Sequence, residues 1–169
     1  MLKKLPRILK HLCFFPWRLR RMLPAHTQSA ITRAIRDSER GHSGEIRFAV
    51  EATLDWPHLR RQQTPRERAL EVFSQLRVWD TELNNGVLIY VLLADRTVEI
   101  VADRGINKRV GQESWQRICA DMEKHFHGGD FEAGILAGIQ TVGGHLAQHF
   151  GGPDLEGDEL PNRPTIIKS

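Results

Sequence analysis

The feature that most constrains the fold is the apolar run VLIYVLLA at residues 87–94. Eight consecutive apolar residues cannot all lie on one face of a strand, so other parts of the chain must cover both faces. The run follows turn residues at 84–86 and precedes a polar break at 95–96, after which residues 97–102 are again rich in β-formers. We therefore expect a β-hairpin whose first strand lies in the middle of a sheet.

Periodic patterns elsewhere predict one more strand and four helices. Residues 45–53 alternate between apolar and polar, which is typical of a strand with one wetter face near the margin of a sheet. Helical spacing of apolar residues is found over residues 24–40, 64–79, 115–126 and 131–150, whereas residues 55–63 are predicted to form a loop. Two glycines inside the last helix predict a close approach of its backbone to the sheet.

A strand, a helix and a strand from residue 45 to residue 94 form a parallel crossover unit, which should be right-handed. Adding the antiparallel hairpin gives a mixed sheet. The predicted fold class is therefore α/β, a three-layer α/β/α sandwich with a small mixed sheet and helices on both faces.

The charge of the chain is concentrated at its N-terminus. The 169 residues carry a net charge of +3, yet residues 1–36 hold nine Lys or Arg and no acid. The C-terminal residues 151–169 contain three prolines and four acids, a composition typical of disorder. We expect a basic amphipathic leader at 1–23, one domain at 24–150 and a disordered tail at 151–169.

The leader alternates apolar residues with seven basic ones, so it is suited to an anionic membrane surface or a membrane-protein partner. Pro6 and Pro16 argue against one continuous helix. A partly disordered leader and a leader packed on the domain are the alternatives. Nucleic-acid binding is not expected, because no recognised nucleic-acid module follows.

The same leader is a poor secretory signal, since its longest apolar run is far shorter than the roughly 7–15 residues that such a signal needs. Nothing in the chain approaches the ~20 apolar residues of a membrane-spanning helix. Cys13 and Cys119 have no metal or redox spacing. The expected location is the cytoplasm, with peripheral attachment to the inner membrane face as part of the hypothesis.

The predicted strand pairing brings polar residues to one edge of the sheet. Carboxylates crowded there repel each other, and a divalent cation with hard oxygen ligands relieves that repulsion. The predicted ligands of a calcium or magnesium ion are Glu45, Asp80 and Asp103. Further candidates for the same cleft are His42, Thr81, Glu82, Asn84, Asn85 and Arg104. Ordinary turns also require Asn, Asp and Gly, so a turn without a ligand is the alternative.

Other chemistry has little support in the sequence. His125 and His127 lie in one loop with Asp130, and one loop supplies too few ligands for a stable metal site. Asp130 is also expected to cap the last helix. Motifs of serine hydrolases, P-loop proteins and zinc proteases are absent from the sequence.

Three segments together resemble the TPM domain family: GEIRFAV, NNGVLIYVLLADRTVEIVADRGI and GDFEAGILAGI. The resemblance implies an α/β/α sandwich and a cleft that binds divalent cations, often calcium. It also implies weak acid phosphatase activity in some members and assembly, repair or receptor-associated roles in others. Within this resemblance, Asp103 and Arg104 match the motif after the hairpin, and Asp130 matches an acidic turn, which makes Asp130 a further cleft candidate. The chain is similar to a short cytoplasmic branch without a signal peptide or transmembrane helix.

Three functional hypotheses follow. The first is an accessory or binding protein with a divalent-cation site, attached to a membrane surface or a membrane protein through its leader. The second is a weak metal-dependent phosphatase in which Glu45, Asp80 and Asp103 hold the ion and Arg104 binds phosphate. The third is an interaction domain without an ion.

Overall fold

The computed structural model describes residues 7–152, 157 and 159–168. Within these residues a four-stranded sheet has the order β3-β2-β1-β4. The strands are β1 (Ile46–Glu51), β2 (Val87–Leu92), β3 (Thr97–Ala102) and β4 (Thr165–Ile167). The helices are α1 (Arg7–Leu12), α2 (Pro16–Met22), α3 (Ala25–Glu39), α4 (Trp56–Arg60), α5 (Pro65–Gln75), α6 (Arg104–Val110), α7 (Gln112–Gly128) and α8 (Phe131–Phe150).

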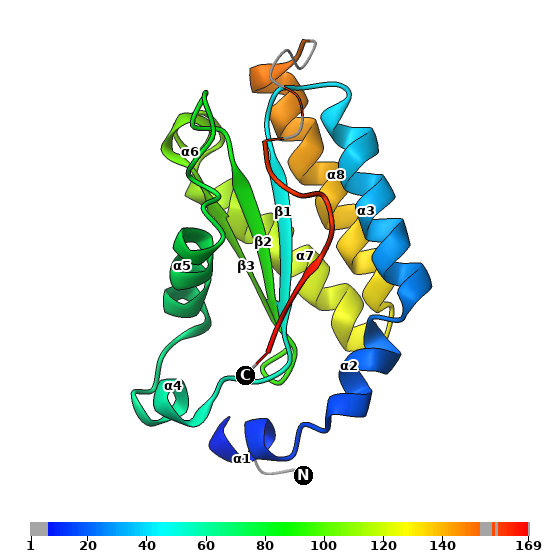
Figure 1. The fold of residues 1–169 in the computed structure, drawn as a ribbon, viewed down its shortest axis with the longest axis vertical. Helices are drawn as coiled ribbons and strands as arrows, with labels where there is room; N and C mark the ends of the chain where they lie inside the picture. Colours follow the sequence, from blue (N-terminus) through cyan, green and yellow to red (C-terminus); the bar gives the residue numbers. More distant parts are fainter. Residues whose placement is uncertain (1–6, 153–156, 158, 169) are drawn as a thin grey trace.

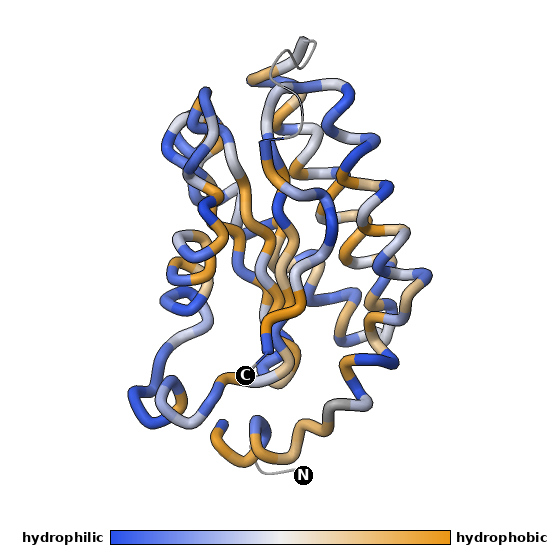
Figure 2. Tube along the Cα trace, viewed as in Figure 1, coloured by the Kyte–Doolittle hydropathy of each residue, from blue (hydrophilic) through white to orange (hydrophobic). Residues whose placement is uncertain are grey.

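The sheet lies between two layers of unequal thickness, which confirms the predicted α/β sandwich (Figure 1). Helices α3, α7 and α8 cover one face, and α5 covers the other. Alternate residues of β1 and β2 supply the two cores: Phe48 and Ile89 pack on the larger side, Ala49 and Tyr90 on the α5 side. Figure 2 shows the apolar residues concentrated along the strands.

The predicted hairpin and crossover are both present. Strand β1 pairs in parallel with β2, Ile46 opposite Val87, and β2 pairs antiparallel with β3, Leu92 opposite Thr97. Every residue of β2 is buried, as its unbroken apolar run requires. At the hairpin turn the Arg96 N–H donates to the Leu93 carbonyl at 3.1 Å, and Arg96 adopts a left-handed φ of 54°.

Strand β1 is no nearer the margin of the sheet than β2, contrary to the prediction, because β4 pairs with its outer edge. The guanidinium of Arg47 holds this segment by donating to the carbonyls of Pro161 and Arg163 and to Thr165 Oγ1. The predicted disorder of residues 151–169 is therefore wrong for 159–168, whereas residues 153–156, 158 and 169 lie outside the described residues. On the wetter face of β1, Arg47 binds the tail, whereas Glu51 binds Arg68 of α5 and Tyr90 of β2.

Several helices differ from the prediction. Residues 55–63 contain α4, because the Asp55 side chain caps the N–H of His58 at 3.2 Å. Helix α6 follows β3 directly and was not predicted. The glycines of α8 approach α7 rather than the sheet: a Cβ on Gly138 would lie 2.3 Å from Met122 Sδ. Helix α5 ends at Gln75, which leaves Trp79 half-exposed instead of buried.

The leader forms α1 and α2 as separate helices, as expected from Pro16, and both pack against the hairpin end of the sheet. Arg7 Nε donates to Asp95 Oδ2 at 2.8 Å. The buried His11 ring contacts Asp95 Oδ1 at 3.2 Å and accepts the Leu54 N–H at Nδ1. Among the described helices, none has the length and apolar character needed to cross a membrane.

Candidate functional site

The strand register brings Glu45 and Asp103 to the same edge of the sheet, one on each side of Gly86. The Val87 N–H donates to the Glu45 carbonyl at 2.8 Å, and the Asp103 N–H donates to the Gly86 carbonyl at 2.9 Å. The backbone arrangement on which the predicted ion site depended is therefore present. The side chains decide whether those residues are available to a ligand.

The carboxylate of Glu45 is engaged with the tail. It is 2% exposed and accepts the N–H groups of Glu159 and Leu160 at 3.3 and 3.1 Å. Asp103 caps α6 by accepting the Arg104 N–H at Oδ1, 2.7 Å away. Its second oxygen, Oδ2, is buried and has no hydrogen-bond partner among the residues that the structure describes. Asp103 thus keeps one oxygen for a further donor or a cation.

The turn before β2 is tied together by its own polar groups. Thr81 Oγ1 accepts the Asn85 N–H at 3.2 Å, and Asn85 Nδ2 donates to the Ser43 carbonyl at 3.0 Å. Asn84 adopts a left-handed φ of 53°, and its carbonyl accepts the Ile106 N–H. Asn85 Oδ1 is buried, and no described residue forms a hydrogen bond with it. These residues therefore stabilise the turn before β2, and a role in ligand binding is not needed to explain them.

The remaining candidates are dispersed. Asp80, Glu82 and Arg104 are exposed at the same edge. His42 contacts Ser38 Oγ at 3.0 Å, on the side of α3 and α8. Asp130 shares a cavity with Arg96 of the hairpin turn, at the other end of the sheet. In the part of the chain that the structure describes, no three His, Cys, Asp or Glu side chains form a cluster suited to a metal ion.

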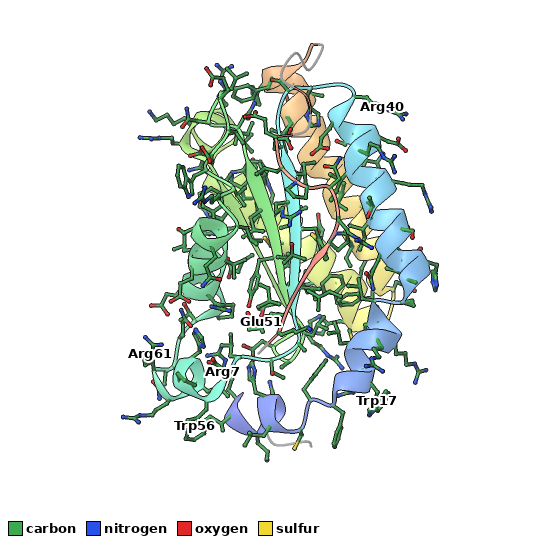
Figure 3. All side chains as sticks on the ribbon, in the orientation of Figure 1. Arg7, Trp17, Arg40, Glu51, Trp56 and Arg61 are labelled. Atoms are coloured by element: carbon green, nitrogen blue, oxygen red, sulfur yellow. The ribbon has the colours of Figure 1, made fainter. Side chains whose placement is uncertain are left out.

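A second candidate surface lies at the hairpin end, where α1, α2 and α4 meet solvent (Figure 3). We call it the hairpin-end surface. Its apolar side chains are 40–66% exposed: Ile8, Leu9, Leu12, Phe15, Trp17 and Trp56. Its exposed basic side chains are Lys10, Arg18, Arg20, Arg21, Arg60 and Arg61. The amphipathic leader predicted part of this surface, but the contribution of α4 was missed because residues 55–63 were predicted to be a loop.

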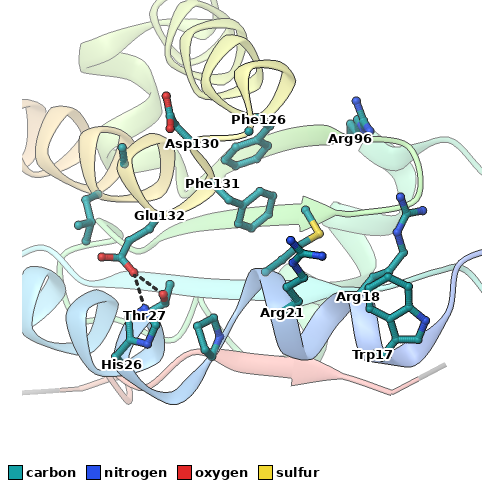
Figure 4. Close-up of a pocket in the computed structure, with 15 residues that line it drawn as sticks. Trp17, Arg18, Arg21, His26, Thr27, Arg96, Phe126, Asp130, Phe131 and Glu132 are labelled. Carbon is teal, nitrogen blue, oxygen red and sulfur yellow. Dashed lines mark hydrogen bonds and ion pairs between the residues drawn. The ribbon is translucent and has the colours of Figure 1, made fainter.

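A cavity of about 820 Å³ adjoins this surface, between α2, the hairpin turn and the junction of α7 and α8. Its apolar wall includes Phe126 and Phe131, whose rings stack with centroids 4.1 Å apart. Arg18, Arg21 and Arg96 lie toward one end, whereas Glu132 lies toward the other with Thr27 and His26 (Figure 4). Nothing in the sequence predicted this cavity, because its wall comes from three distant segments.

Comparison with known proteins decides the family. Residues 19–145 match the family model described as the TPM domain. The chain belongs to the TPM domain family. A TPM domain therefore makes up most of this chain, and the match begins within α2 and includes β1, β2 and β3.

The TPM domain of this chain is similar to two structures solved by NMR. BA42 from the psychrophilic bacterium Bizionia argentinensis shares 37% sequence identity over 85% of this chain and 94% of BA42, with a TM-score of 0.74. The N-terminal domain of a protein from P. gingivalis shares the fold at 20% identity, covering 78% of this chain and 82% of that domain, with a TM-score of 0.63. No curated protein matches the chain.

Proposed function

We propose that this TPM domain is an accessory protein that attaches peripherally to an anionic membrane through its hairpin-end surface. The observation that carries the proposal is the set of exposed apolar side chains on α1 and α2, with Leu12 66% and Trp17 56% exposed. Side chains of this size, interleaved with exposed basic residues, are typical of segments that lie in the headgroup region.

The way in which the leader packs supports this orientation. His11 and Leu23 are buried against the domain, so the helices that contain Leu12 and Trp17 are held with these apolar side chains outward. A leader that served only to cover the core would bury its largest apolar residues. Here Leu12 and Trp17 remain exposed to water. This exposure of apolar surface is unfavourable in free energy, and contact with a membrane would remove it.

The charges at this end support an anionic lipid surface. Asp95 pairs with Arg7 and His11, and Asp55 lies against His58, so both acids are already compensated. Lys10, Arg20 and the other exposed basic residues have no such partner among the described residues. Each Lys or Arg close to an anionic leaflet contributes about 1 kcal/mol to attachment, and salt screens this term.

Vesicle flotation tests the proposal, with phosphatidylcholine vesicles that contain or lack phosphatidylglycerol. The full chain should float with the anionic vesicles, and less so at high salt. The variant Leu12→Ser/Trp17→Ser should lose at least tenfold in affinity. The matched control is Leu70→Ser/Trp79→Ser, which removes the same two residue types from exposed positions of 46% and 50% elsewhere. Equal binding by the two variants would exclude the proposed surface.

A second candidate function is divalent-cation binding at the opposite edge of the sheet. It is supported by Asp103 Oδ2, which is buried without a partner in the described part of the chain, because such an oxygen is costly unless a donor or a cation approaches it. Glu45 would join the ligands only after exchanging the tail amides that it now binds. Asp80 is exposed and would have to move toward Asp103.

Thermal unfolding with and without calcium or magnesium tests the cation candidate. An ion at 100 times its dissociation constant should add about 2.7 kcal/mol to the free energy of unfolding. Asp103→Asn should abolish this response while keeping the cap of α6, since Asn is also a good capping residue. Asp130→Asn, at the other end of the sheet, is the control. An unchanged response in Asp103→Asn would reject this site, and full phosphatase turnover in that variant would reject the enzyme hypothesis.

A further inference from the structure

We propose that the cavity beside α2 binds the phosphate headgroup of a single anionic phospholipid, with the start of its acyl chains against Phe126 and Phe131. The inference rests on the proposed membrane attachment and gives it a specific ligand. A flat anionic surface would attract any basic patch. A built cavity would instead hold one lipid and fix the orientation of the domain.

The cationic end of the cavity is formed by Arg18, Arg21 and Arg96. In the described part of the chain no carboxylate forms an ion pair with any of the three guanidinium groups; Arg18 lies over the Phe14 ring, 5.5 Å from its centroid. A guanidinium matches a phosphate group with two parallel hydrogen bonds. This end of the cavity therefore favours a phosphate over a neutral headgroup.

The two acids of the cavity do not cancel this charge. Glu132 is hydrogen-bonded by Thr27 Oγ1 and lies 3.7 Å from His26 Nε2. Figure 4 shows this group at the end away from Arg18. Asp130 is exposed at the rim. A bound lipid can therefore place its phosphate at the arginines without meeting an unpaired buried carboxylate.

The apolar wall argues for a lipid and against inorganic phosphate. Phe126 and Phe131 are 6% and 8% exposed, and Met22 and Leu136 add further apolar surface. A volume of about 820 Å³ is in the range of small-molecule sites. A phosphate ion would leave this wall in contact with water, whereas a glycerol backbone and the first acyl carbons would cover it.

The cavity is continuous with the hairpin-end surface. Trp17 and Arg18 line the cavity and also belong to that surface. A neighbouring cavity of about 490 Å³ shares Arg18 and Arg96 and adds Lys10, and its carboxylate, Asp95, is paired with Arg7 and His11. A lipid in the leaflet that faces the protein would thus reach the cavity without leaving the bilayer.

The backbone of Arg96 is strained, and Arg96 also lines the cavity. Arg96 has a left-handed φ of 54° at the end of a hairpin turn, where glycine is the favoured residue. The turn itself would be more stable with glycine or asparagine. Arg77 has a similar φ of 52° outside the cavity, so the assignment of Arg96 rests on its place in the cavity lining.

Chemical-shift titration of the full chain by NMR tests the inference, with dihexanoyl phosphatidylglycerol below its micelle concentration. We expect saturable shifts confined to residues 17–27, 95–97 and 126–136. Inorganic phosphate and dihexanoyl phosphatidylcholine should bind at least tenfold more weakly. Equal binding of inorganic phosphate would show a simple anion site and overturn the lipid assignment.

Matched arginine variants separate the cavity from general surface charge. Arg21→Ala and Arg96→Gly should each weaken binding of the short-chain lipid at least fivefold. Arg20→Ala removes the same charge from α2 outside the cavity, and Arg77→Gly makes the same change at another arginine with positive φ, 52°. Both controls should stay within twofold of the native chain. Equal losses in the cavity variants and the controls would overturn the inference.

The flotation assay makes the two proposals separable. A chain that floats but shows no shifts around the cavity overturns the lipid site and leaves membrane attachment standing. A chain that binds the short-chain lipid at the cavity but does not float supports the lipid site and rejects membrane attachment. Loss of lipid binding in Arg96→Gly, with flotation reduced but present, supports both.

Discussion

At the scale of single residues, the most constrained group is a buried ion pair on the α5 side of the sheet. Arg68 Nε and Nη2 donate to the two carboxylate oxygens of Glu51 at 2.9 and 3.0 Å. Tyr90 Oη donates to Glu51 Oε2 at 2.6 Å. Burial, reinforced by the Glu51 charge, raises the pKa of Tyr90 well above its ordinary value, so the phenol stays protonated and donates. One carboxylate thus joins β1, β2 and α5.

Removing Arg68 should be much more costly than removing an exposed ion pair. Arg68→Met leaves Glu51 buried and uncompensated, which costs about 3–5 kcal/mol of unfolding free energy. The double variant Arg68→Met/Glu51→Leu should lose less than the sum of the two single variants, because it leaves no buried charge. Urea unfolding measures all three. A loss below about 1 kcal/mol in Arg68→Met would contradict the role assigned to this pair.

The sequence pattern predicts that Glu51 lies on the polar face of its strand, but it does not predict the partner of its carboxylate. The alternation of residues 45–53 shows which side chains share a face, but Arg68 comes from α5 and the tail comes from more than a hundred residues away. The same limit applied to Glu45: the sequence offered a metal ligand or an ordinary turn, whereas in the structure its carboxylate accepts the amides of the tail. Partners supplied by the tertiary fold leave no local pattern.

At the scale of elements, the docking of α1 on the domain depends on one carboxylate. Asp95 of the hairpin turn accepts hydrogen bonds from Arg7 of α1 and from the buried His11 ring. His11 in turn accepts a hydrogen bond from the Leu54 N–H. Burial alone would raise the pKa of Asp95, but the hydrogen bonds from His11 and Arg7 prevail and lower it. The charged carboxylate is therefore the form that docks α1.

Docking of α1 should accordingly weaken in acid. A lowered folded-state pKa means that the stabilisation is present above the ordinary carboxyl value of about 3.9 and is lost as the pH falls through the folded value. Hydrogen exchange of the Leu54 amide reports docking directly. Asp95→Asn should release this amide already at neutral pH, whereas Asp121→Asn, from an exposed pair with Lys124, should not. Protection of Leu54 in Asp95→Asn equal to that in the native chain would refute this account.

Elements with a strong local sequence pattern were predictable, and elements formed through tertiary contacts or a single cap were not. The unbroken apolar run of β2 and the capping box of Thr64 and Glu67 determine their elements locally, and the structure contains both. The three-residue β4 is formed by pairing with β1 rather than by its own pattern. Helix α6 begins at Arg104 and is capped by Asp103, which the sequence suggested as a metal ligand. A capping aspartate and a metal-binding aspartate have the same sequence signal.

At the scale of the whole molecule, the two ends of the sheet differ in character. The end with Glu45 and Asp103 carries the acidic candidates, and the hairpin end carries the exposed apolar and basic side chains of α1, α2 and α4 (Figure 3). Asp130 was grouped with the first end, but it lies at the second, where it lines the same cavity as Arg96. The sequence indicated a basic leader, whereas its place on the domain depended on the salt bridge to Asp95.

The orientation on a membrane is the central claim, and the tryptophans test it most directly. Three variants each keep the buried Trp115 and one exposed tryptophan, Trp17, Trp56 or Trp79, with the others replaced by Phe. Anionic vesicles with brominated acyl chains quench tryptophans that enter the bilayer. The account predicts strong quenching of Trp17 and Trp56 and none of Trp79, which lies toward the opposite end. Quenching of Trp79 equal to that of Trp17 would contradict it.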